Sequence, residues 1–221
     1  MSLFAAGMSD PSYDDLEGLL AGPGSIERRG DVARVSVAVV DDWRAEVMLR
    51  ALAVLGPGAE VETSPTGLDV RTAFVPELSA LAERWQSFAG KHPPAGLRLD
   101  GARLWWWCVA AGSADPVGYR LGLAAADSDA VWSAAGAALA SAGVPAALVG
   151  PRANGPAYRV VGARRLVRLA ELVGAVPYGV PVEGWPSAGH GSGGHGSGGH
   201  GGVGGGRAVR SAGNYGGPAP S

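Results

Sequence analysis

The chain has 221 residues, of which 47% are hydrophobic and 17% are charged, and its formal net charge is −2. These values are typical of a globular protein, and the near-neutral balance excludes a global basic field that would attract nucleic acid or an anionic membrane. The single cysteine excludes an internal disulfide framework and fits a reducing compartment.

The sequence was searched for a signal peptide and for a membrane-spanning segment. The first residues lack the positive segment and the apolar run of a signal peptide. No window reaches the roughly 18 uncharged apolar residues that predict a membrane-spanning helix. We therefore expect a cytoplasmic protein without a membrane partner.

The first half of the folded region predicts an alternation of helices and strand pairs. Ser12 and Asp15 form a capping-box pattern that predicts a helix over about 13–22, which a Gly-Pro-Gly run ends. The turn Arg28–Asp31 separates two strands, the second of which is Val32–Val40. The pattern then predicts a helix from Asp41 or Asp42 to Leu55, strands near 59–63 and 68–73, and a helix over 76–88.

The second half repeats this order. The elements that it predicts are a helix over about 101–111, a turn at 114–118, a strand over 119–125, a helix over 128–142, strands near 146–149 and 157–161, and a helix over 164–173. Gly24 and Gly112 are 88 residues apart, and Asp41 and Asp127 are 86 apart. The agreement of these offsets indicates an internal duplication.

The predicted organisation has five parts. They are an N-terminal extension over 1–12, a first repeat over 13–89, a linker over 90–100, a second repeat over 101–178, and a tail over 179–221. The tail is rich in Gly, Ser and His, a composition that predicts disorder. Its histidines, His190, His195 and His200, recur every five residues. We predict no metal site there, because a flexible segment fixes no ligand geometry.

A duplicated αββαββα unit whose first helix ends in Gly resembles the LAGLIDADG homing-endonuclease family. The motif segments are Leu16–Gly24 and Leu104–Gly112. The chain is also similar to the LAGLIDADG-like region of the WhiA family of sporulation regulators. The resemblance implies an α+β fold in which two repeats are related by a pseudo-dyad, with the two motif helices side by side and the strands forming a saddle over DNA.

In that family the penultimate residue of each motif is an acid that binds Mg²⁺ beside the scissile phosphates. Here Pro23 and Ala111 stand at these positions, and neither side chain ligates a metal. Glu17 and Asp115 are displaced by several residues. The resemblance therefore implies a degenerate member without a metal cofactor or catalytic residues. WhiA proteins end in a helix-turn-helix domain, whereas this chain ends in Gly/His repeats, so the resemblance does not imply operator recognition of that kind.

Three function hypotheses follow. The first is a non-catalytic DNA-binding or regulatory protein, with double-stranded DNA as its partner. The second is a protein-interaction scaffold without nucleic-acid binding, and the third, which Pro23 and Ala111 disfavour, is an active homing endonuclease. For the first hypothesis the candidate DNA-binding residues lie on outward strand positions and in the neighbouring turn: Arg34, Arg71, Arg120, Arg159, Arg28 and Arg29.

Other conspicuous residues have a structural interpretation. Trp105, Trp106 and Trp107 point about 100° apart on a helix, which indicates packing between the repeats rather than one exposed platform. Trp106 is predicted to fill the space left by the motif glycines. Cys108 is interpreted as a core residue. A last set, Arg164, Arg165 and Arg168, is interpreted as the solvated face of the final helix.

Overall fold

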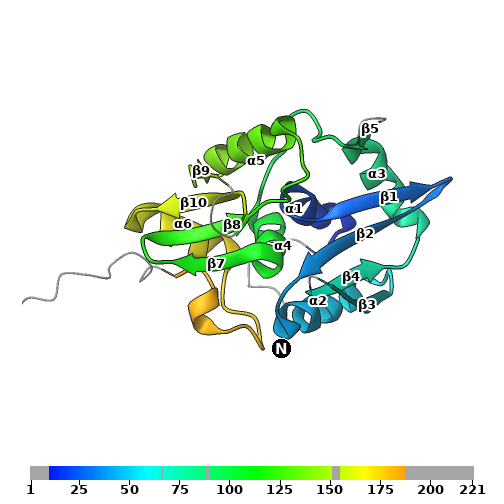
Figure 1. Cartoon of the computed structure of the whole chain (residues 1–221), viewed down its shortest axis with the longest axis horizontal. Coiled ribbons are helices and arrows are strands. Elements are labelled where there is room, and N and C mark those ends of the chain that lie inside the picture. The colour runs from blue at the N-terminus through cyan, green and yellow to red at the C-terminus, as the bar shows by residue number, and fades with distance from the viewer. Residues whose placement is uncertain (1–9, 66, 88–89, 151–154, 188–221) are drawn as a thin grey trace, which may run out of the picture.

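The computed structural model describes residues 10–65, 67–87, 90–150 and 155–187. In this part of the chain six α-helices and two four-stranded antiparallel sheets form two units with the same αββαββα order. Figure 1 shows a sheet on either side of a central pair of helices, α1 (Glu17–Ala21) and α4 (Gly101–Ala111). The predicted pair of repeats in an α+β fold is confirmed. None of the described helices is long and apolar enough to cross a bilayer.

The first repeat surrounds a sheet of order β1-β2-β4-β3. A short 3-10 helix, Tyr13–Leu16, leads into α1 and begins with the predicted capping box between Ser12 and Asp15. The remaining elements are β1 (Ser25–Arg29), β2 (Val32–Val39), α2 (Asp42–Leu55), β3 (Ala59–Ser64), β4 (Gly67–Thr72), a 3-10 turn at Pro76–Leu78 and α3 (Ser79–Trp85). The second strand alternates as predicted, because Val35, Val37 and Val39 are buried against the helices while Arg34 faces away from them.

The second repeat surrounds a sheet of order β7-β8-β10-β9, which matches the order of the first. Its elements after α4 are β7 (Gly112–Asp115), β8 (Gly118–Gly122), α5 (Asp129–Ser141), β9 (Ala147–Val149), β10 (Ala157–Val161) and α6 (Ala163–Val173). One face of α6 is buried through Leu166, Leu169 and Val173, as predicted. Leu172, which was assigned to the same face, is only partly buried.

Three predicted element boundaries are wrong. The strand assigned to 119–125 is β8, which ends at Gly122. The helix assigned to 76–88 ends at Trp85, because β5 (Gln86–Ser87) leaves it and pairs with β6 (Gly90–Lys91) inside the predicted linker. Phe88 lies outside the described residues. The segment 114–118 is not wholly a turn, since β7 runs to Asp115 and pairs with β8.

The two motif helices pack with their backbones very close together. A Cβ atom on Gly18 would lie 1.8 Å from the carbonyl oxygen of Arg103, and one on Gly22 would lie 2.5 Å from the Trp107 ring. The packing interpretation of the tryptophan run is confirmed, because all three side chains are at most 1% exposed. The assignment of Trp106 to the glycines is wrong. Trp107 packs on Gly22, whereas the Trp106 ring lies edge-on to Trp105 at 5.2 Å.

The predicted start of the tail at 179 lies inside the packed part of the chain. Val180 and Trp185 are buried, and the Trp185 ring lies 6.4 Å from Trp105. The indole of Trp185 donates to the carbonyl oxygen of Gly174, and the Tyr119 hydroxyl donates to that of Gly184. Residues 179–187 therefore complete the core of the second repeat. The three tail histidines lie outside the described residues.

Candidate nucleic-acid interface

A cleft of about 520 Å³ lies where the C-terminal ends of α1 and α4 meet the sheets of both repeats. Pro23 lines it after α1, and Ala111 lines it at the end of α4. The two positions at which the motif places acids therefore share one cleft. Asp41 and Asp115 supply its carboxylates, and both are already ion-paired, to Arg44 at 2.8 Å and to Arg159 at 3.0 Å.

Arg44 binds the end of the second motif helix. Its guanidinium donates to the carbonyl oxygens of Val109 at 2.6 Å and Gly112 at 2.7 Å, with a longer contact of 3.4 Å to Cys108. The side chain is 9% exposed. A buried cation at this point satisfies carbonyls that lack an intrahelical partner and complements the negative end of the helix dipole. Arg44 thus joins the first repeat to the end of α4.

Lys91 has the same role at the end of the first motif helix. Its ammonium group donates to the carbonyl oxygens of Gly22 and Gly24, at 3.1 and 2.9 Å, and forms an ion pair with Asp127. Burial lowers the pKa of Lys91 and raises the pKa of Asp127, because desolvation penalises both charges. Asp41 and Asp127 are at matching positions of the two repeats. Asp41 of the first repeat holds Arg44 at the end of α4, and Asp127 of the second repeat holds Lys91 at the end of α1.

The displaced acid Glu17 lies at the other end of α1, away from the cleft. It is 7% exposed, and its carboxylate pairs with Arg103 at 2.9 Å and with Arg84 at 3.2 Å. Burial opposes the charges of both arginines, but their acidic neighbours hold the pKa of each above its ordinary value. Glu17 therefore connects α1 to α3 and α4.

On the outer face of the first sheet, the predicted arginines are paired with acids. Arg34 and Arg29 both contact Glu27, at 2.9 and 2.8 Å, and both lie over the Phe74 ring. The hydrogen bond from Arg29 holds the pKa of Glu27 below its ordinary value. Arg28 does not share this face. It lies on the helix side of β1 and pairs with Glu83 of α3 at 3.0 Å.

Arg71 lies on the same face of the first sheet, between two acids that oppose each other across β3 and β4. Its guanidinium pairs with Asp69 at 2.6 Å and with Glu62, and Asp69 is the main reason why its pKa is raised. Like charges at directly opposite strand positions repel, so Arg71 offsets that repulsion. With Glu27 and Glu60, this face carries four acids against three arginines, and the predicted residues do not form a continuous basic strip.

On the second sheet, Arg120 and Arg159 are directly opposite each other on β8 and β10. Arg159 pairs with the Asp115 carboxylate, and Arg120 donates to the carbonyl oxygen of Gly155 at 3.2 Å. Arg120 also lines the cleft between the sheets. The structure brings these two residues together, next to the end of α4.

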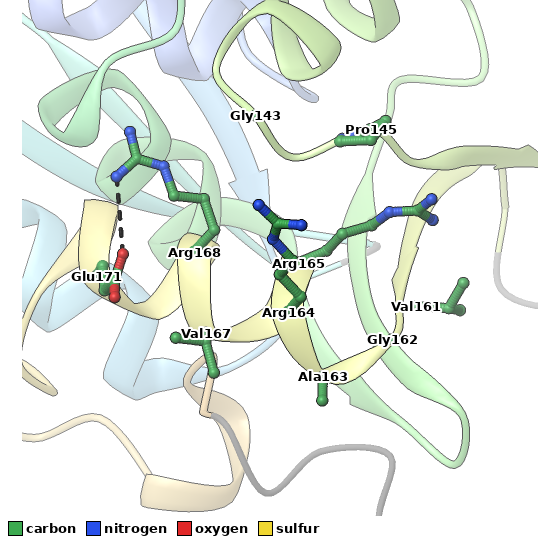
Figure 2. A pocket seen from close by; sticks show the side chains of 10 residues that line it. All are labelled: Gly143, Pro145, Val161, Gly162, Ala163, Arg164, Arg165, Val167, Arg168 and Glu171. Carbon is green, nitrogen blue, oxygen red and sulfur yellow. Dashed lines mark ion pairs between the residues drawn. The ribbon is translucent and has the colours of Figure 1, made fainter.

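Arg164, Arg165 and Arg168 are exposed, as their interpretation as a solvated helix face expects, and they also form a second basic surface that the sequence analysis did not predict. An open cavity of about 1010 Å³ lies between α6 and the segment after α5, and Arg164, Arg165 and Arg168 line it. Figure 2 shows their three guanidinium groups on the side of α6 that faces Gly143 and Pro145. In the sequence, three arginines within five residues were the feature that could have indicated this surface. In the structure, Glu171 is the one acid among the residues that line the cavity.

No protein-family model and no curated protein sequence matches the chain. Among solved structures, one similar chain is described as the homing endonuclease I-WcaI bound to its DNA recognition sequence. It has 12% identity and a TM-score of 0.55, over 76% of this chain and 83% of that one. Another is the N-terminal LAGLIDADG domain of DUF199/WhiA, with 12% identity and a TM-score of 0.49 over 73% and 80% of the two chains. The likeness shows a LAGLIDADG-type fold.

Proposed function

We propose that this protein binds double-stranded DNA without cleaving it, in a regulatory rather than a nucleolytic role. The observation that carries the proposal is the chemistry at the ends of the two motif helices. The end of α1 presents Pro23 and is bound by the buried Lys91, and the end of α4 presents Ala111 and is bound by the buried Arg44; neither Pro23 nor Ala111 can ligate a metal through its side chain. The scaffold is thus arranged around a pair of cations where the resembled nucleases use acids.

The donor set in the cleft does not fit a catalytic pair of Mg²⁺ ions. Magnesium prefers several oxygen ligands in octahedral geometry, commonly including one or two carboxylates. Asp41 and Asp115 are engaged by Arg44 and Arg159, and the described residues contain no group of three or more candidate metal ligands. A buried guanidinium and a buried ammonium nearby would also repel a divalent cation.

The support for DNA binding is the fold together with the charge. The similar chain I-WcaI is described as bound to its DNA recognition sequence. In this protein Arg120 and Arg159 lie side by side on the second sheet, beside the cleft. Guanidinium groups bridge phosphate oxygens well because their donors form a planar fork.

The proposal is tested by titrating a fluorescent duplex of about two helical turns with the purified protein at several salt concentrations. We expect binding at low salt that weakens with a slope of log K against log salt of about −3 to −4, corresponding to roughly four phosphate contacts. Incubation of supercoiled and linear DNA with Mg²⁺ should leave both intact. Cleavage that EDTA abolishes would contradict the non-catalytic assignment.

A protein-interaction scaffold without nucleic-acid binding is the second candidate. The observation that favours it is the pairing of Arg34, Arg71 and Arg159 with carboxylates, which leaves little free positive charge on the strands. If no duplex binds even at low salt, this second function replaces the first.

A further inference from the structure

We infer that the cavity on α6, lined by Arg164, Arg165 and Arg168, is a phosphate-binding surface for duplex DNA, separate from the outer faces of the sheets. The inference deepens the proposed function and rests on it. It is carried by the ion pairing of the arginines rather than by their number. On the strands, Arg34, Arg71 and Arg159 are paired with acids. Of the three α6 arginines, Arg168 alone has an acid at ion-pair distance within the described residues.

Arg164 and Arg165 are the two arginines of this surface without an acidic partner. Within the described residues, no carboxylate lies at ion-pair distance from either, and both residues are exposed. Arg168 lies 3.7 Å from Glu171, and the two side chains are 49% and 60% exposed. An exposed pair at that distance contributes little, so Arg168 is readily released to another anion. Three arginines therefore face one acid around the cavity.

The surface is held rigidly although its charged groups are exposed. The opposite face of α6 is buried through Leu166, Leu169 and Val173, which fixes the helix against the second repeat. Gly143 brings the segment after α5 close to Arg168, since a Cβ atom at Gly143 would lie 3.7 Å from the Arg168 Nε atom. The guanidinium groups therefore project from a fixed base on one side of α6 (Figure 2).

The spacing and lining of the cavity fit the backbone of a duplex. Arg164 and Arg168 are one helical turn apart, about 6 Å along the axis, a length over which one DNA strand presents about two phosphates. The apolar lining residues are small and aliphatic, such as Pro145, Val161 and Val167. Without an aromatic side chain the lining offers no stacking platform for the bases of a single strand. The expected contact is with phosphates and independent of sequence.

The test compares the salt dependence of duplex binding for variants of the full chain. Arg164→Gln together with Arg165→Gln should reduce the slope of log K against log salt by about 2, and adding Arg168→Gln should bring the loss to about 3. The matched control is Arg50→Gln with Arg98→Gln. It removes two positive charges from residues outside both proposed surfaces. This control should keep the wild-type slope within about 0.5. Thermal unfolding confirms that each variant is folded.

Three outcomes would overturn the inference. If the wild type binds DNA and the α6 variants keep its slope, the phosphate contacts lie elsewhere and the proposed function stands. If the wild type binds no duplex, both the inference and the proposed function fail. If a polyglutamate peptide displaces the duplex from the wild type at equal charge concentration and binds more tightly, the cavity takes an acidic protein segment instead.

Discussion

At the scale of single residues, Arg44 links the two repeats through its side chain. It donates to the Val109 and Gly112 carbonyl oxygens at the end of α4 and is anchored by Asp41. Hydrogen bonds from a charged donor contribute more than neutral ones, and these are shielded from water. Removing the guanidinium leaves buried carbonyls without a partner.

We therefore predict that Arg44→Met lowers the free energy of unfolding by about 2 to 4 kcal/mol, measured by urea denaturation. Asp41→Asn is the matched control. The Asp41 side chain is 44% exposed, so its loss should cost about 1 kcal/mol or less. Equal effects of the two substitutions would show that the ion pair, and not the binding of the helix end, carries the stabilisation.

Cys108 gives the protein a defined sensitivity to alkaline pH. The thiol is fully buried, and burial raises its pKa from 9.0 to about 12. In the unfolded chain the thiol ionises above about pH 9, whereas in the folded protein it stays protonated. Its contribution to stability is therefore complete below pH 9 and is lost as the pH rises from about 9 to about 12.

The prediction is a divergence between wild type and Cys108→Ala. From pH 9 to pH 11 the unfolding free energy of the wild type should fall by about 2 kcal/mol more than that of the variant. Denaturant titrations at several pH values measure the difference. Parallel pH profiles would contradict a buried, protonated thiol.

At the scale of elements, the contact between α1 and α4 depends on glycine for space rather than for flexibility. Helix propensity alone favours Ala over Gly by about 1 kcal/mol. At Gly18 the added methyl group would lie 1.8 Å from the Arg103 carbonyl oxygen, which belongs to the backbone and cannot rotate away. The two helices would have to separate.

Gly18→Ala should therefore destabilise the protein by about 3 kcal/mol, despite its better propensity. Gly150→Ala serves as the comparison, because a Cβ atom there meets nothing within 4 Å. Thermal unfolding of both variants decides the matter. A Gly18→Ala protein that melts at or above the wild-type temperature would show that the helices are less closely packed than described.

The same helix pair shows what the sequence was able to predict. The repeated motif ending in Gly112 predicted α4 to the residue, and the alternation of valines predicted β2 nearly so. The partner of Gly22 was predicted wrongly, because neighbouring tryptophans differ only in direction, and that direction depends on how α4 is rotated against α1. Lys91 was assigned to a linker for the same reason, as its contacts lie 67 and 69 residues away.

At the scale of the whole molecule, the C-terminal segment belongs to the fold. Composition alone placed 179–221 in a tail, but Val180 and Trp185 are buried, and the Trp185 ring packs against Trp105. The average composition of a Gly-rich segment does not reveal that a few apolar residues within it are buried. In the candidate site, the strand arginines were predicted correctly as outward residues. Some of their acidic partners depend on how the strands are arranged, since Glu27 reaches Arg34 from β1 and Asp115 reaches Arg159 from β7.

Two truncations test this assignment. A chain that ends after Ser187 retains Trp185, whereas one that ends after Glu183 loses it together with the Gly184 acceptor of Tyr119. The shorter chain should be less stable by about 3 kcal/mol, the usual cost of removing a large buried aromatic side chain. Equal unfolding midpoints for the two chains would show that the segment is not part of the cooperative unit.

The contact between Gly22 and Trp107 also makes the two repeats different from each other at their shared interface. Gly18 and Gly22 form a recess on α1, and α4 supplies the matching bulk. If two copies of the first repeat met through α1, no bulky side chain would fill the space beside Gly18 and Gly22. If two copies of the second repeat met through α4, Trp107 would have no glycine opposite it and would clash. Each half is therefore complementary to the other and not to itself, so neither repeat is expected to form this contact with a second copy of itself.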